Sequence, residues 1–171
     1  MSTAAAIAVG AKQVAELLAA RQLKVAFAES CTGGLIAGAL TAVPGISAWH
    51  CGGVVVYRNE TKQALLNIPQ KLLLHPGPVS EQVAKLMAER VLEIVPEADV
   101  SLSITGHLGP KAPPELDGGV FIAVAFRQAK QPAVRVQRLQ LPPQTTRLAR
   151  QKRAVAEALQ YLARNLDVNG K

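Results

Sequence analysis

The chain has 171 residues, of which 49% are hydrophobic, and its formal net charge is +7. This length is typical of one domain that buries roughly 70% of the surface exposed by the unfolded chain. Its longest purely apolar runs fall far short of the ~20 residues that a membrane span requires, so no membrane association is expected.

The cysteines and histidines are too few and too scattered for a metal site or a disulfide framework. Cys31 and Cys51 form no CxxC motif, and His50, His75 and His107 show no metal-ligand spacing. We therefore expect no metal, and a cytoplasmic protein whose thiols are reduced.

Positive charge is concentrated towards the end of the chain. Residues 1–126 carry nine Lys/Arg and ten Asp/Glu, whereas residues 127–171 carry ten Lys/Arg and two Asp/Glu. Such a basic segment is typical of proteins that bind nucleic acid or a phosphorylated small molecule. Tyr161 is the only aromatic residue in that segment, and stacking on bases normally uses several, so nucleic acid is the less favoured partner.

Helical spacing alternates with short apolar segments along the chain. No basic segment precedes the first helix, so we expect it to pack on the domain instead of serving as a secretory signal. Asn59 and Ser80 precede two other helical segments and are predicted to cap them. The predicted helices are residues 11–22, 33–41, 59–68, 80–95 and 146–165, and the predicted strands are 24–28, 50–59, 99–106, 118–127 and 133–141.

These elements predict an α/β fold, a single-domain three-layer α/β/α sandwich over residues 1–171 with its core over about residues 10–165. The last two strands follow each other without a helix between them, so we expect a mixed, mostly parallel sheet. Residues 133–141 alternate apolar and basic side chains, which is typical of an outer strand with one wet face.

The segment AESCTGG, residues 28–34, places small polar residues between a predicted strand and a predicted helix. Ligands of α/β proteins bind at the carboxyl ends of strands, and the free N–H groups at a helix start favour an anion or an oxyanion. Ser30 is therefore a candidate nucleophile, with the N–H groups of residues 31–34 as candidate oxyanion donors. In the alternative interpretation, Ser30 or Thr32 only caps the helix; Cys31 as nucleophile is less favoured because the sequence places no histidine beside it.

A serine nucleophile needs a base, and the segment VVYRNETK supplies one. Tyr57 ends a predicted strand and Lys62 follows in the first turns of the next helix, so both are expected on the same rim of the sheet as Ser30. A lysine removed from water can accept a proton near neutral pH, and Ser-Lys pairs perform acyl transfer in unrelated folds. Taken singly, each residue also fits an ordinary exposed helix lysine or strand aromatic.

Taken together, five segments resemble the CinA C-terminal domain family, the nicotinamide mononucleotide (NMN) deamidases. The resemblance covers roughly residues 10–165 and keeps the family's order. The segments are AESCTGG (28–34), VPGISAW (43–49), GGVVVYRNETKQALL (52–66), GPVSEQVAKLMAE (77–89) and ITGHLGP (104–110).

The resemblance implies hydrolysis of the NMN carboxamide to nicotinic acid mononucleotide and ammonia, without metal or organic cofactor. It maps the catalytic residues onto Ser30, Lys62 and Tyr57, with Tyr57 tuning Lys62 or relaying its proton and N–H groups near Thr32 and Gly33 holding the oxyanion. Arg147 is a candidate for the substrate phosphate, and a homo-oligomer is expected. The residues assigned to substrate binding are Glu29, Cys31, Thr32, Gly33, Gly34, Thr105, Gly106, His107 and Arg147.

The chain departs from the family pattern in two places. The family usually reads TGIAGPxGG followed by KPVG, where this chain has TGHLGPKAPPELDGG over residues 105–119, so prolines replace glycine N–H donors and Asp117 brings a charge that would repel a phosphate. In the tail, Arg147 is kept but Gln151 stands four residues later, where the family favours arginine.

The sequence thus favours an amidohydrolase acting on NMN. The first alternative is a catalytically weak or silent relative that binds nucleotide or acts as an oligomeric interaction protein. The second is a basic nucleic-acid-binding protein, whose binding would weaken steeply with salt.

Overall fold

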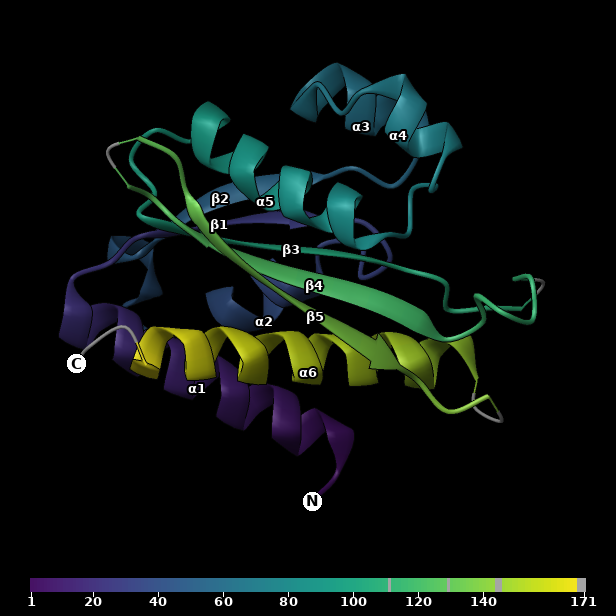
Figure 1. Cartoon of the computed structure of the whole chain (residues 1–171). Helices are drawn as coiled ribbons and strands as arrows, with labels where there is room; N and C mark the ends of the chain where they lie inside the picture. The colour runs from purple at the N-terminus through teal and green to yellow at the C-terminus, as the bar shows by residue number, and fades with distance from the viewer. Residues whose placement is uncertain (111, 129, 144–145, 169–171) are drawn as a thin grey trace.

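In the computed structural model, residues 1–110, 112–128, 130–143 and 146–168 are described. Five strands form one sheet in the order β2-β1-β3-β4-β5 (Figure 1). β1 pairs in parallel with both β2 and β3, whereas β4 pairs antiparallel with β3 and β5, so β4 alone runs against the other four strands. The strands are β1 (Val25–Glu29), β2 (His50–Val55), β3 (Val100–Gly106), β4 (Gly119–Phe126) and β5 (Ala133–Gln140).

Helices cover both faces of this sheet, as Figure 1 shows. One layer holds α3 (Asn59–Leu66), α4 (Gln70–Leu74) and α5 (Glu81–Ile94), and the other holds α1 (Thr3–Arg21), α2 (Leu35–Thr41) and α6 (Arg147–Val168). A short 3₁₀ helix, η1 (Ile46–Ala48), precedes β2. The predicted three-layer α/β/α fold with a mixed, mostly parallel sheet is therefore confirmed.

The alternation of side chains along β1 explains the two cores. Val25 and Phe27 belong to the core under α1, α2 and α6, while Ala26 and Ala28 belong to the core under α3, α4 and α5. Because both faces are covered, every residue of β1 is buried, including Glu29 at its end.

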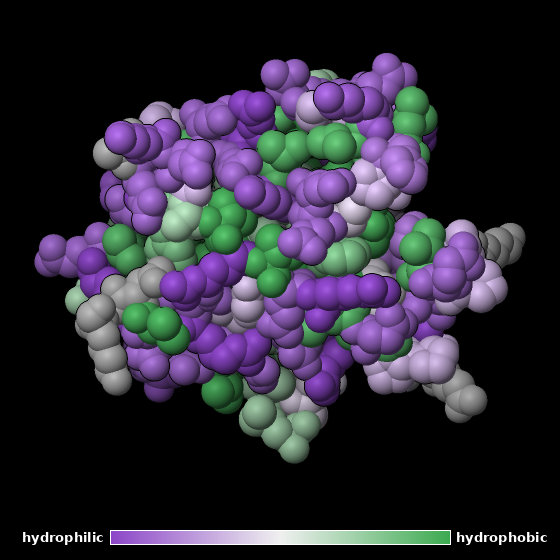
Figure 2. Space-filling model, in the orientation of Figure 1, coloured by the Kyte–Doolittle hydropathy of each residue, from purple (hydrophilic) through white to green (hydrophobic). Residues whose placement is uncertain are grey.

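The edge strand β5 behaves as its alternating sequence predicts. Its exposed and half-buried residues alternate, and it lies at the end of the sheet beside β4. Figure 2 shows that the face over β4, β5 and α6 is mostly hydrophilic, with apolar side chains scattered among the polar ones.

The first helix packs on the domain as predicted, but it starts earlier, at Thr3, with Ser2 as its cap. By length and composition α1 could also cross a membrane, since its most apolar 18 residues have a mean hydropathy of 1.3. In the structure one side of α1 packs along α6, where Gly10 lies against Leu159.

Several element ends differ from the prediction. α2 begins at Leu35 instead of residue 33, because Gly33 and Gly34 adopt left-handed φ angles of 65° and 94° that a helix cannot contain. Asn59 is the first residue of α3 and not its cap; the Thr61 hydroxyl accepts the N–H of Arg58 there instead. Ser80 caps α5 as predicted, by accepting the N–H of Val83.

Candidate active site

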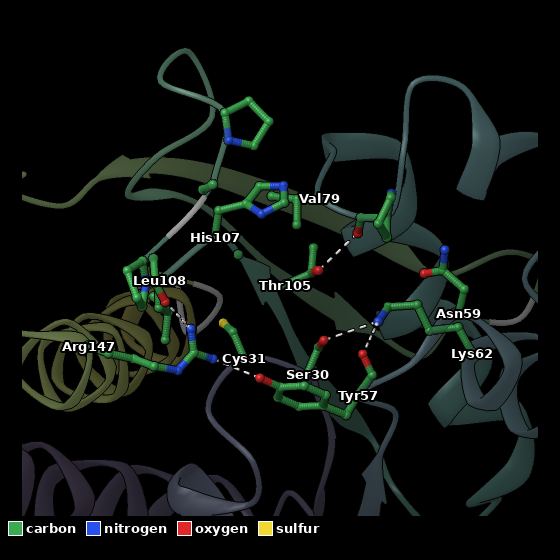
Figure 3. A pocket seen from close by; sticks show the side chains of 16 residues that line it. Ser30, Cys31, Tyr57, Asn59, Lys62, Val79, Thr105, His107, Leu108 and Arg147 are labelled. Carbon is green, nitrogen blue, oxygen red and sulfur yellow. Dashed lines mark hydrogen bonds between the residues drawn. The ribbon is translucent and has the colours of Figure 1, made fainter.

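A cavity of about 300 Å³ opens at the carboxyl ends of β1 and β3 and beside the segment after β2 (Figure 3). The ends of these three parallel strands meet at one edge of the sheet, so the residues that follow them converge. The residues that line the cavity are Ser30, Cys31, Tyr57, Asn59, Lys62, Pro78, Val79, Thr105, Gly106, His107, Leu108, Gly109, Pro110, Ala112, Pro113 and Arg147.

In the wall of this cavity, the candidate nucleophile Ser30 is hydrogen-bonded to Lys62. Lys62 Nζ lies 3.0 Å from Ser30 Oγ and donates to the backbone oxygen of Val56 at 2.8 Å, with the Tyr57 oxygen at 3.4 Å. The Lys62 side chain is only 1% exposed, and this burial lowers its pKa from 10.5 to about 8.

The two carbonyl groups fix how the amine of Lys62 is oriented. A neutral amine has two N–H donors and one lone pair. When both N–H groups point at the oxygens of Val56 and Tyr57, the lone pair is left facing Ser30. This is the geometry required of a general base for the serine hydroxyl.

Glu29 supports the segment that carries Ser30. Its buried carboxylate accepts the Thr32 hydroxyl at 2.6 Å, the N–H of Gly34 at 3.0 Å and two N–H groups from the first turn of α2 at 3.2 and 2.8 Å. The charge therefore satisfies the orphan donors at the start of α2. Contrary to the expectation of direct substrate contact, Glu29, Thr32, Gly33 and Gly34 lie outside the cavity lining, because this carboxylate holds them behind Ser30.

The expected oxyanion donors are reduced to two by the turn itself. Gly33 N–H donates to the Ser30 carbonyl at 3.1 Å and Gly34 N–H donates to Glu29, so neither is free for a substrate. Within the described residues, the N–H groups of Cys31 and Thr32 donate to no other residue, although the Cys31 N–H faces its own thiol. These two N–H groups are therefore the remaining candidates for an oxyanion, with Cys31 in the cavity lining and Thr32 buried next to it.

Cys31 lines the cavity next to Ser30 but is a poor nucleophile. Its thiol is buried, and this burial raises its pKa to about 12, so the thiol stays protonated near neutral pH.

Tyr57 reaches the site differently from the prediction. Its backbone oxygen contacts Lys62, whereas its hydroxyl accepts a hydrogen bond from Arg147 Nη2 at 2.7 Å. Figure 3 shows the ring directed towards Arg147 and away from the lysine amine. The prediction that the Tyr57 hydroxyl is the direct partner of Lys62 is therefore wrong. Val56 is buried whereas Tyr57 is exposed, so the Tyr57 side chain points away from the buried lysine amine.

This arrangement can be placed among known proteins. The sequence model of the CinA C-terminal domain family matches residues 8–166. The chain belongs to this family.

Two relatives named as CinA-like or competence-damage inducible proteins are similar to this chain in sequence. A CinA-like protein of Geobacter metallireducens is 46% identical over 114 residues, and a putative competence-damage inducible protein of Bacillus cereus is 41% identical over 113 residues. Each alignment covers 66% of this chain but 27% of the relative, so the chain spans about a quarter of the length of these curated relatives.

Solved structures of the CinA family share the fold over nearly their whole length. The competence/damage-inducible protein CihA from Agrobacterium tumefaciens has a TM-score of 0.87 and 32% identity, covering 95% of this chain and 96% of that one. A CinA superfamily protein from Klebsiella pneumoniae has a TM-score of 0.86 and 29% identity, covering 98% and 99%.

The loop that departs from the CinA pattern forms one wall of the cavity. Thr105 donates its hydroxyl to the Pro78 oxygen at 2.9 Å, and His107 follows at the cavity edge. Burial lowers the pKa of His107 below its ordinary 6.5, with Asp117 opposing the shift, so the imidazole is neutral at pH 7 and above. Lys111 of this loop lies outside the described residues.

Asp117 is not the free negative charge that the sequence suggested. Arg150 donates to both of its carboxylate oxygens at 2.7 Å, and this hydrogen bonding holds the pKa of Asp117 below its usual value. Gly109 packs directly on this pair with a φ of 64°; a Cβ there would lie 2.9 Å from the Arg150 guanidinium. The ion pair thus neutralises Asp117 and anchors the loop to α6.

The start of α6 contributes Arg147, which was predicted and lines the cavity, and two residues, Arg150 and Gln151, that were not assigned to the site. Arg147, Arg150 and Gln151 stand at i, i+3 and i+4, the spacing that places them on one face of a helix. That spacing was the available signal, but the segments they contact lie far away in the sequence. Asn59, Pro78 and Val79 are further lining residues that were not predicted.

Proposed function

We propose that this CinA-family domain is an amidohydrolase that converts the carboxamide of NMN to the acid, giving nicotinic acid mononucleotide and ammonia. The observation that carries the proposal is the contact of 3.0 Å between Ser30 Oγ and a buried lysine whose pKa is lowered to about 8. A serine and a lysine poised in this way at the wall of a cavity are suited to acyl transfer from an amide.

The first half of the reaction forms an ester. Lys62 takes the hydroxyl proton of Ser30 while Oγ attacks the carboxamide carbon, and we assign the oxyanion to the N–H groups of Cys31 and Thr32. Lys62 then returns the proton to the amide nitrogen. The C–N bond breaks, ammonia leaves, and the acyl group stays on Ser30.

The second half regenerates the enzyme. A water molecule gives a proton to Lys62 and attacks the ester carbon. Collapse of this intermediate breaks the bond to Ser30 Oγ, which takes the proton back from Lys62. The sum is one amide and one water consumed, with one carboxylic acid and one ammonia formed.

Arg147 and His107 suit the remaining parts of the substrate. Arg147 donates to the Gly109 oxygen and to the Tyr57 hydroxyl, and its guanidinium has five N–H donors, so further donors are available to a phosphate at the cavity mouth. His107 offers a neutral imidazole to the ring or ribose of the substrate.

The alternative, a weak or silent relative, rests on the same loop. Pro110, Pro113 and Pro114 have no N–H, so the loop offers fewer backbone donors to a nucleotide than a glycine-rich loop would. In that alternative, NMN binds without release of ammonia.

The test is the reaction of purified protein with NMN in water labelled with ¹⁸O. We expect ammonia in equal amount to nicotinic acid mononucleotide, with the label in the new carboxylate, and no product with Ser30→Ala. Nicotinamide riboside, which lacks the phosphate, should react with a higher KM. Binding of NMN by the wild-type protein without product would reject the proposal in favour of the silent relative.

A further inference from the structure

Gln151 connects α6 to the turn that carries the nucleophile. Its side-chain Nε2 donates to the Cys31 oxygen at 3.2 Å and to the Thr32 oxygen at 3.4 Å. These residues are 120 and 119 positions away in the sequence. The amide is thus placed against the Cys31–Thr32 and Thr32–Gly33 peptide groups.

The turn between β1 and α2 is held from two sides. The Glu29 carboxylate accepts hydrogen bonds from the end of the turn nearer α2, namely from the Thr32 hydroxyl and from the N–H groups of Gly34 and the first turn of α2. The Gln151 amide donates to the Cys31 and Thr32 carbonyl groups, at the end of the turn nearer Ser30. Among the hydrogen bonds of the described residues, the Cys31 oxygen accepts from Gln151, whereas the Thr32 oxygen also accepts the N–H of Leu35 at 3.3 Å.

The direction of a carbonyl fixes the direction of the neighbouring N–H. In a planar trans peptide the C=O of one residue and the N–H of the next point in opposite directions. By holding the Cys31 oxygen, Gln151 sets the direction of the Thr32 N–H, one of the two N–H groups near Ser30 that donate to no other described residue.

We propose that Gln151 is a positioning residue for the catalytic turn: its amide donates to the Cys31 and Thr32 carbonyl groups and so holds the Thr32 N–H in place as an oxyanion donor next to the Ser30 peptide. This inference rests on the proposed function in that it assigns acyl transfer to Ser30. It does not depend on which amide is the substrate.

Gln151 has a different target from its neighbour Arg150 on the same helix face. Arg150 contacts Asp117 in the substrate loop and the oxygens of Pro142 and Pro143. Among the described residues, the side-chain hydrogen bonds of Gln151 go to the turn that carries the reacting hydroxyl. Loss of the Gln151 amide should therefore lower kcat and leave KM within about twofold, because donors that act on the transition state affect the chemical step.

The experiment compares four variants of the full chain with the wild-type protein. Gln151→Met keeps the length of the side chain and removes both donors, and Gln151→Glu replaces them with a negative acceptor. Gln151→Arg keeps two donors for the two carbonyls. Lys152→Met is the matched control, because Lys152 is the next residue of α6 and its side chain is exposed.

The first readout is independent of NMN. A phosphonofluoridate reacts with an activated serine: the Oγ–P bond forms, the P–F bond breaks, fluoride leaves and Lys62 takes the proton. The labelling rate of Ser30 is measured by mass spectrometry at 25 °C, beside the Tm of each variant. The second readout is kcat and KM for ammonia release from NMN.

We expect labelling to slow by about tenfold or more in Gln151→Met, since small displacements of reacting groups cost up to ~10²-fold. Gln151→Glu should be slower still, while Gln151→Arg and Lys152→Met should label at rates close to wild type. Equal labelling rates in wild type and Gln151→Met, or a rate that falls only as Tm falls, would overturn the inference. So would an unreactive Ser30 in the wild type.

The two proposals fail in different ways. Labelling of wild-type Ser30 that depends on Gln151, without ammonia from NMN, rejects the proposed substrate and supports the inference. Turnover of NMN that is unchanged in Gln151→Met supports the function and rejects the inference.

Discussion

Arg147 donates a hydrogen bond from Nη2 to the hydroxyl of Tyr57 at 2.7 Å, and so joins α6 to the segment after β2 at the mouth of the cavity. The base Lys62 instead donates a hydrogen bond to the backbone oxygen of Tyr57. The side chain and the backbone of one residue therefore serve two different parts of the site.

Tyr57→Phe separates these two parts. The backbone contact to Lys62 is kept, so the pH dependence of kcat should stay as in the wild type. Arg147 loses its phenolic acceptor, so KM for NMN should rise by roughly threefold to tenfold, as expected for the loss of one hydrogen bond of ordinary strength at an exposed site. Steady-state kinetics between pH 6 and 9.5 measure both effects. A shifted pH profile with unchanged KM would instead assign the hydroxyl to the base.

The activity should follow the protonation of Lys62. The amine acts as a base only when neutral, and burial lowers its pKa to about 8. We therefore expect kcat/KM to rise about tenfold per pH unit well below pH 8 and to level off above it. A profile that levels off below pH 6.5 would point to a histidine such as His107, whose pKa burial also lowers.

The same lysine makes stability depend on pH. The folded pKa of about 8 is below the ordinary 10.5, so the unfolded chain binds more protons between these values and stability rises with pH across that window. For Lys62 this amounts to a gain of about 2 kcal/mol between pH 7 and 9.5, out of about 3 kcal/mol in total. Denaturant unfolding of wild type and Lys62→Gln at both pH values isolates the effect. An equal pH dependence in the two proteins would contradict the burial of a titrating amine.

Glu29→Gln tests the support of the nucleophile turn. One hydroxyl and three N–H groups converge on the buried carboxylate, and a neutral amide with a single oxygen cannot accept all four. We expect a loss of about 3 kcal/mol in the free energy of unfolding, since hydrogen bonds to a buried charge are strong. Glu16→Gln, on the exposed side of α1, should change it by less than about 0.5 kcal/mol. Similar values for the two variants would show that Glu29 does not hold the turn.

The layers of the fold and the convergence of Ser30 with Lys62 could be predicted from local patterns. Alternating helical and apolar segments define the sandwich, and residues that follow neighbouring parallel strands must meet at one edge of the sheet. α4 was missed because five residues are too few for a periodic pattern. The predicted homo-oligomer stays a prediction.

The remaining features of the site depend on tertiary contacts that no local pattern carries. The direction of the Tyr57 hydroxyl is set by Arg147, 90 residues later, and the charge of Asp117 is neutralised by Arg150, 33 residues later. Likewise, Glu29 was predicted to bind substrate because it stands next to Ser30 in the sequence. It turns inward because the start of α2 leaves N–H groups that need an acceptor.

The most direct test of the central claim, that Lys62 activates Ser30 for hydrolysis of the NMN amide, is the rate of ammonia release by wild type, Ser30→Ala and Lys62→Gln at pH 8.5. Lys62→Gln keeps N–H donors for the two carbonyls but cannot accept a proton. We expect turnover by the wild type and a loss of at least about 10³-fold in each variant. Turnover that persists in Lys62→Gln or in Ser30→Ala would contradict this claim.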